Sequence, residues 1–138
     1  MMRHDWTLLC TEVEPQEHGT ITLGNVFSTL QVYSPFGNTE QPELLLFDPP
    51  AVLVSQWTAE FDADRRVHTA IVQLLAPGGN QLLWGDEVEF DLRGKSVFHM
   101  IYLLHDLPLV SRGTFEYHVY LNSLGPIGEW GRASLTIS

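Results

Sequence analysis

The stretch Thr114-Phe-Glu-Tyr-His-Val-Tyr-Leu-Asn122 alternates apolar and polar side chains more regularly than any other part of the sequence. In an extended strand, side chains two residues apart share a face, so this alternation separates a side that faces a core from a side that faces solvent. The apolar side holds Phe115, Tyr117, Val119 and Leu121, and the polar side holds Glu116, His118 and Tyr120. The stretch therefore predicts a β-strand with one buried side.

The same period of two recurs on either side of this stretch, between clusters of Gly, Pro, Asn and Asp. No segment shows the longer period of a helix. The predicted strands cover residues 6–13, 20–33, 51–62, 67–75, 81–84, 87–92, 96–107, 114–122 and 132–137. The alternation of residues 51–62 predicts a core side that holds Leu53, Trp57, Ala59 and Phe61. The charged turn Asp62–Arg66 suggests that residues 51–62 and 67–75 form a hairpin. About seven to nine short strands are typical of an antiparallel two-sheet β-sandwich, Ig-like or jelly-roll-like. A closed β-barrel is the alternative, and residues 1–138 are expected to form a single domain.

The composition limits the classes of partner. Seventeen acidic side chains against seven basic ones give a formal net charge of -10, and such a field repels phosphate. Nucleic acid and anionic membrane surfaces are therefore not expected partners. Cys10 is the only cysteine, so no intramolecular disulfide can form. We find neither a membrane-spanning stretch nor a signal peptide, and we expect an acidic, cytoplasmic protein.

A proline-rich connection, Ser34–Pro50, contains four consecutive apolar residues, Leu44–Phe47. Long connections often bind partners, although this one could simply cross from one sheet to the other. An apolar run of this kind needs cover, and a second copy of the chain is the simplest cover. Tryptophans beside glycine in predicted loops could contact the same partner or stack on sugars. The candidate interaction surface is therefore Leu44, Leu45, Leu46, Phe47, Trp84 and Trp130.

Candidate catalytic and metal-binding groups are scattered along the chain. His99 and His105 share one predicted strand, but six residues at about 3.3 Å each separate them by ~20 Å, too far for one zinc ion. The carboxylates of Glu87, Glu89 and Asp91 share one strand face, where they would serve to guard a sheet edge. The sequence therefore assigns no catalytic residue, no metal ligand and no cofactor.

These observations favour a non-enzymatic binding or protein-interaction module, whose partner is a second copy or another protein. Two alternatives stay open. The first is a small metal-dependent hydrolase, which needs at least two of its candidate histidines to meet beside a carboxylate. Those histidines are His68, His99, His105 and His118. The second is a carbohydrate-binding module that uses an exposed aromatic platform.

Four segments of the chain resemble a family of small uncharacterised bacterial proteins, a domain of unknown function. They are Trp6–Cys10, His18–Phe27, Leu74–Gly79 and Gly113–Asn122. The resemblance spans most of the chain and implies a compact β-sandwich, without an activity or site residues. Ser34–Pro50 and Gly125–Gly131 do not match the family's pattern, so they are the places to look for an individual function.

Overall fold

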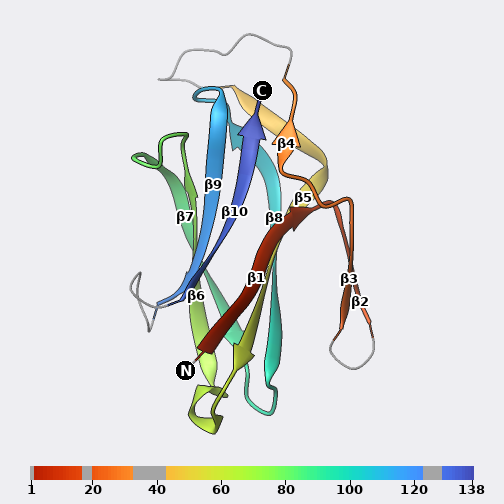
Figure 1. The fold of residues 1–138 in the computed structure, drawn as a ribbon, viewed down its shortest axis with the longest axis vertical. Coiled ribbons are helices and arrows are strands. Elements are labelled where there is room, and N and C mark those ends of the chain that lie inside the picture. Colours follow the sequence, from red (N-terminus) through yellow and green to blue (C-terminus); the bar gives the residue numbers. More distant parts are fainter. Residues whose placement is uncertain (1, 17–19, 33–42, 123–128) are drawn as a thin grey trace.

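The computed structural model describes residues 2–16, 20–32, 43–122 and 129–138, and in these residues the chain is built from β-strands (Figure 1). The strands are β1 (Met2–Cys10), β2 (Glu12–Pro15), β3 (Ile21–Gly24), β4 (Thr29–Leu30), β5 (Leu44–Ala59), β6 (Val67–Leu75), β7 (Leu82–Asp91), β8 (Val97–Pro108), β9 (Gly113–Leu121) and β10 (Trp130–Ile137). A short 3₁₀ turn, Asp62–Asp64, follows β5. The predicted all-β sandwich is confirmed, and the sheets formed by these residues do not close into a barrel.

Two main sheets form the layers of the sandwich. One has three strands in the order β1-β5-β8, and the other has five in the order β4-β10-β9-β6-β7. Neighbouring strands are antiparallel, except that β4 pairs in parallel with β10. β2 and β3 form a separate hairpin that projects beside β5 in Figure 1. The antiparallel arrangement agrees with the predicted class of fold.

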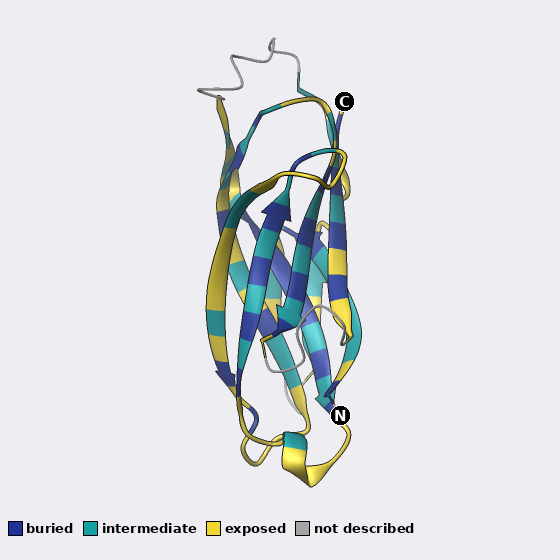
Figure 2. Ribbon diagram, turned by 90° about the vertical axis from the view of Figure 1, so that its left-hand side faces the viewer, coloured by how far each residue is buried: buried dark blue, intermediate teal, exposed yellow. Residues whose placement is uncertain are grey.

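The alternation in β9 produces the centre of the main core. Its odd-numbered side chains from Phe115 to Leu121 are buried between the sheets, while its even-numbered ones are partly exposed. They share one apolar cluster with Leu53 and Trp57 of β5 and with Met100 of β8. Figure 2 shows the resulting bands of buried and less buried residues along the strands. Because burying a side chain the size of Phe115 contributes about 1.5–3 kcal/mol, this interface is the main source of stability.

β5 is longer than predicted and is irregular near its beginning. It pairs with β8 at Leu46 opposite Asp106 and again at Ala51 opposite Leu104, so residues 47–50 lie opposite His105 alone. Two prolines, Pro49 and Pro50, fall in this bulge, where the ladder needs no N–H donor from them. The prolines therefore interrupt the pairing with β8 but do not end the strand.

At its other end, β5 stops before Phe61. The alternation predicts that Phe61 faces the core with Trp57 and Ala59, but its side chain is 64% exposed. The strand ends at Ala59 and the chain turns through Asp62–Asp64, so the period of two no longer applies at Phe61. That prediction was wrong for Phe61 and is confirmed for the other two residues.

The outer face of the three-stranded sheet has a second, smaller apolar cluster. Cys10, Val52 and Val54 are buried there, and the partly buried Val13 and Ile21 of the β2–β3 hairpin pack against them. This hairpin covers only part of the outer face. Both faces of β5 are therefore covered in this region, which accounts for its continuous apolar run from residue 51 to residue 54.

Side chains, rather than backbone hydrogen bonds, connect the edge strands β7 and β8. The rings of Phe90 and Phe98 stack with their centroids 4.2 Å apart, and those of Trp84 and Tyr102 stack at 5.9 Å. Within the described residues, each of these strands is the last in its sheet. One long side of the sandwich is therefore closed by aromatic rings between two unpaired strand edges.

Candidate functional site

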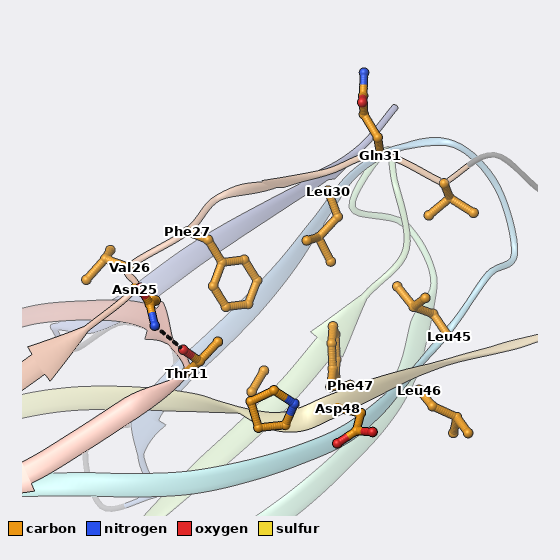
Figure 3. Close-up of a pocket in the computed structure, with 13 residues that line it drawn as sticks. Thr11, Asn25, Val26, Phe27, Leu30, Gln31, Leu45, Leu46, Phe47 and Asp48 are labelled. Atoms are coloured by element: carbon orange, nitrogen blue, oxygen red, sulfur yellow. Dashed lines mark hydrogen bonds between the residues drawn. The ribbon is translucent and has the colours of Figure 1, made fainter.

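A hollow of about 550 Å³ lies between the chain segment 25–32 and the beginning of β5, and we call it the β4–β5 pocket (Figure 3). Phe27 and Leu30 line one side, and Leu45 and Phe47 line the other. Ala51, which is buried, also contributes to the lining. Pockets that bind small molecules commonly measure about 300–1,000 Å³ and are mostly apolar. The β4–β5 pocket has both properties.

The bulge in β5 forms the first wall of the β4–β5 pocket. Figure 3 shows Leu45 and Phe47 pointing toward Leu30 and Phe27, while Leu46 and Asp48 point to the other side of the strand. A bulged strand bends locally because its extra residues have no partners opposite them. The bend allows Phe47 to line an open hollow instead of packing in a continuous ladder.

Backbone hydrogen bonds to both sheets hold the second wall. The N–H of Phe27 donates to the carbonyl of Leu9 on β1 at 3.1 Å, and the N–H of Thr136 on β10 donates to the carbonyl of Ser28 at 2.8 Å. The pairing of β4 with β10 continues this attachment through Leu30. The segment that carries Phe27 and Leu30 is therefore anchored on both sides and preforms its wall.

One end of the β4–β5 pocket is polar. The side-chain amide of Asn25 donates to the hydroxyl oxygen of Thr11 at 3.0 Å. Asn25 has a φ of 55°, in the left-handed region that asparagine tolerates better than most residues. This bond uses one amide hydrogen of Asn25 and one lone pair of Thr11. Among the described residues, the amide oxygen of Asn25 and the hydroxyl hydrogen of Thr11 stay available to a ligand.

Strand alternation divides the predicted apolar surface Leu44–Phe47 into two parts. Leu45 and Phe47 line the β4–β5 pocket. Leu44 and Leu46 face solvent, with exposed fractions of 54% and 71%. Leu45 and Phe47 therefore point into the hollow, Leu46 points away from it in Figure 3 but still borders it, and Leu44 does not line it.

The two candidate tryptophans lie elsewhere. Trp84 lies within strand β7 instead of a loop, and its ring packs against Tyr102 and Tyr117. Trp130 begins β10 and is 42% exposed, with its ring 4.7 Å from that of His118. Neither tryptophan lines the β4–β5 pocket. The structure thus does not bring them together with Leu44–Phe47.

The four histidines of the hydrolase hypothesis come from three strands, His68 from β6, His99 and His105 from β8, and His118 from β9. His68 is buried, His99 lies on the outer side of the three-stranded sheet opposite Gln56, and His118 lies on the five-stranded sheet beside Glu116. His105 is exposed opposite the β5 bulge. Across residues 2–16, 20–32, 43–122 and 129–138, no three or more His, Cys, Asp or Glu side chains are placed to hold a metal ion.

The predicted acidic face of β7 is present. Glu87, Glu89 and Asp91 are exposed and lie opposite alternate residues of β6, so they share one side of the strand. Arg93 donates three hydrogen bonds from its guanidinium to the Asp91 carboxylate, and this contact lowers the pKa of Asp91 to about 2. The β7 face is therefore a solvated acidic surface.

A chain of hydrogen bonds that the sequence did not reveal joins β1 to β5. The Nε2 atom of His4 lies 2.7 Å from the Thr7 hydroxyl, which lies 2.7 Å from the Ser55 hydroxyl. Ser55 is fully buried, and burial lowers the pKa of His4. Gly131 of β10 packs directly on His4 and Thr7. With Ser55 out of solvent, this chain of bonds holds strands together and is not open to a substrate.

No protein-family model matches this chain, and no curated protein matches it. The resemblance of its four segments to a bacterial family therefore stays a prediction. In the part of the chain that the structure describes, no helix is long and apolar enough to cross a membrane.

Proposed function

We propose that this protein is a non-enzymatic binding module whose β4–β5 pocket holds a small, uncharged, mainly apolar molecule. The observation that carries the proposal is a preformed hollow of about 550 Å³ whose walls are mainly apolar. Its polar lining residues are Thr11, Asn25, Gln31 and Asp48, and the Asp48 carboxylate points away from Phe27 and Leu30 in Figure 3. The chemistry of a site, and not the sandwich fold, must support a function, because one fold serves many functions. The proposal places the module in the cytoplasm, in keeping with its single, buried Cys10.

The lining of the pocket indicates the kind of ligand. Phe27 and Phe47 offer aromatic surface, and Leu30 and Leu45 offer aliphatic surface. Aromatic and aliphatic walls favour a ligand with little charge, since burying a charge without a partner is costly. At the polar end, Asn25 can accept one hydrogen bond from the ligand. The fitting ligand has an apolar body and one hydrogen-bonding group.

Titration with N-phenyl-1-naphthylamine tests this function. The probe is uncharged and apolar, carries a single N–H, and becomes fluorescent when it leaves water. We expect its emission to rise and to saturate at one probe per chain. Straight-chain alcohols should then displace it, and longer chains should displace it at lower concentration because each buried methylene adds about 0.8 kcal/mol.

A filled pocket provides the specific variant. Leu30→Trp places a larger side chain in the hollow and should abolish the saturable signal. Leu82→Trp adds the same indole at an exposed leucine that does not line the pocket, and it should keep the signal. Emission that does not saturate, or that survives equally in both variants, would contradict the proposal. Thermal unfolding of both variants confirms that they are folded.

A further inference from the structure

β8 presents an unpaired strand edge with an apolar outer face. On one side it pairs with β5 over most of its length, and no other described strand pairs with it. Its outward side chains include Val97, Ile101 and Leu103, with Leu103 56% exposed. The β2–β3 hairpin covers the neighbouring β1 and β5 but leaves these residues exposed. An unpaired apolar edge of this kind is a ready template for another strand.

The edge of β7 differs from that of β8, although the two strands lie side by side. β7 carries Glu87, Glu89 and Asp91, which protect an edge because a pairing strand would have to approach several carboxylates. β8 has no charged side chain from Val97 to Leu104. The protection common at sheet edges is therefore present on β7 and missing on β8.

The surroundings of the β8 edge are acidic. Asp86 of β7 accepts a hydrogen bond from the Tyr102 hydroxyl at 2.6 Å, which places a carboxylate at the tip of the Tyr102 side chain on the inner side of β8. Asp106 lies near the end of the strand. A strand added to β8 would point alternate side chains toward Ile101 and Leu103 on one side and toward Asp86 on the other. The matching pattern is apolar residues alternating with Lys or Arg.

We propose that the free edge of β8 binds an extended basic segment of a partner protein, in which apolar residues alternate with Lys or Arg. Backbone hydrogen bonds to β8 supply the affinity, and the alternating side chains supply the selectivity. The net charge of -10 attracts such a segment over a distance of several ångströms. This site is separate from the β4–β5 pocket and does not require a ligand there.

Charge favours a basic partner over a second copy. Pairing two β8 edges would bring the Asp86 and Asp106 carboxylates of two acidic chains toward each other. Like charges placed opposite one another in a sheet are destabilising. A basic segment instead places opposite charges together. Self-association through β8 is therefore the competing outcome of the experiment and not the expected one.

The probe is a synthetic nine-residue peptide of alternating Lys and Val with blocked ends, titrated into the isotope-labelled protein by NMR and by calorimetry. We expect one peptide per chain, with the largest amide shifts along Val97–Pro108. A peptide of alternating Glu and Val should not bind. The Lys-Val peptide with its central amides N-methylated should lose binding, because it keeps every charge but cannot donate to the edge of β8.

Variants of the protein test the same contacts. Ile101→Lys with Leu103→Lys should weaken binding at least about tenfold, and Asp86→Asn should weaken it about threefold. The control is Trp130→Lys with Val26→Lys, which adds the same charge at two exposed apolar residues, one on β10 of the other sheet and one beside β1 at the opposite edge from β8. It should change the affinity by less than about twofold. Circular dichroism confirms that each variant is folded.

Three results would overturn the proposal. The N-methylated peptide could bind as well as its parent, which would mean simple charge attraction. The control variant could weaken binding as much as the β8 variant. The protein alone could form a dimer by light scattering that Ile101→Lys with Leu103→Lys converts to a monomer, which would mean that a second copy occupies the edge.

Discussion

Replacing Gly131 by alanine tests how closely β10 packs against β1. A Cβ atom added at Gly131 would overlap the hydroxyl oxygen of Thr7 and the Nε2 atom of His4. These two atoms are hydrogen-bonded to each other, and Thr7 continues the bond to Ser55. Gly131 is not among the described glycines with positive φ, so its backbone suits alanine. Only the lack of space opposes the substitution.

Three contributions determine the effect of this substitution on stability, and one of them is stabilising while the other two are destabilising. In a strand, alanine in place of glycine normally stabilises a protein by about 0.5–1 kcal/mol. Forcing a side chain into filled space costs about 1–3 kcal/mol. Displacing Thr7 leaves the buried Ser55 hydroxyl without its partner, which costs about 1–3 kcal/mol more. We therefore expect Gly131→Ala to lower the free energy of unfolding by about 1–5 kcal/mol.

Urea unfolding followed by tryptophan fluorescence measures this free energy. Gly85→Ala is the matched control, because Gly85 also lies within a strand and a Cβ there would meet its nearest neighbours at 3.7 Å, an ordinary contact. It should leave the free energy unchanged or raise it by up to about 1 kcal/mol. If Gly131→Ala is as stable as the wild type with the same dependence on urea, the reasoning about this contact is refuted.

Three further predictions use other parts of the fold. Phe115→Ala empties a fully buried position and should lower the free energy of unfolding, measured in urea, by about 3–5 kcal/mol. Phe61→Ala removes an exposed ring and should change this free energy by less than about 0.5 kcal/mol, so equal effects of the two variants would contradict the assigned core. By NMR titration the pKa of Asp91 should be about 2, and Arg93→Ala should return it toward its ordinary value, because the Arg93 hydrogen bonds lower it. A lowered pKa in the folded state means that this pair stabilises the fold above the unfolded-state pKa and loses its effect as the pH falls toward 2; an unchanged pKa in the variant would exclude Arg93 as the cause. Burial lowers the pKa of His4, although the negative charges of Glu129 and Asp5 act in the opposite direction. The unfolded chain therefore binds a proton on His4 at a higher pH than the folded chain does, and the free energy of unfolding should fall as the pH drops from about 7 to about 5. The variant His4→Gln should show a smaller fall in Tm over that range, and an equal fall would exclude His4 as the cause.

The sequence identified the buried faces better than the pairing of strands. The alternation of Thr114–Asn122 predicted the side of β9 that is buried, because a period of two depends only on local geometry. The turn at Asp62–Arg66 suggested that residues 51–62 and 67–75 form a hairpin. Instead, β5 pairs with β1 and β8, and β6 pairs with β7 and β9. Alternation does not specify a neighbour, so a turn between paired strands and a turn between sheets look alike in sequence.

Breaks in the alternation were also misleading. Residues 81–84 and 87–92 were predicted as two separate strands, but most of both lies in the single strand β7, with Gly85 opposite Gln73 in the ladder. Pro49 and Pro50 suggested a loop, yet they occupy a bulge inside β5. Glycine and proline mark local irregularity, and a sheet absorbs such irregularity when the strands on either side remain paired.

The candidate pocket was only half predictable. The apolar run Leu44–Phe47 indicated that something covers or fills this region, and Leu45 and Phe47 do line the hollow. The opposite wall comes from Phe27 and Leu30, which are distant in sequence and belong to a segment predicted only as a half-buried strand. A contact between two distant segments leaves no periodic signal in a single sequence.

The sequence of β8 and its surroundings in the fold disagree about how many of its faces are covered. Ser96–Leu107 is almost continuously apolar, which predicts a strand covered on both faces. In the described residues the inner face is covered, but Ile101 and Leu103 on the outer face are exposed. The residue pattern is that of a covered strand, while the fold leaves one face open. This mismatch is the reason to expect an added strand there.

The two proposed sites share the β5–β8 ladder but lie on opposite sides of it, so their tests can be separated. Leu45 and Phe47 face the β4–β5 pocket, whereas Ile101 and Leu103 face outward from β8. Leu30→Trp should therefore block the naphthylamine probe and leave peptide binding unchanged, and Ile101→Lys with Leu103→Lys should do the reverse. If either variant removes both activities, the cause is disruption of the shared ladder, and neither result then counts as evidence for a direct contact.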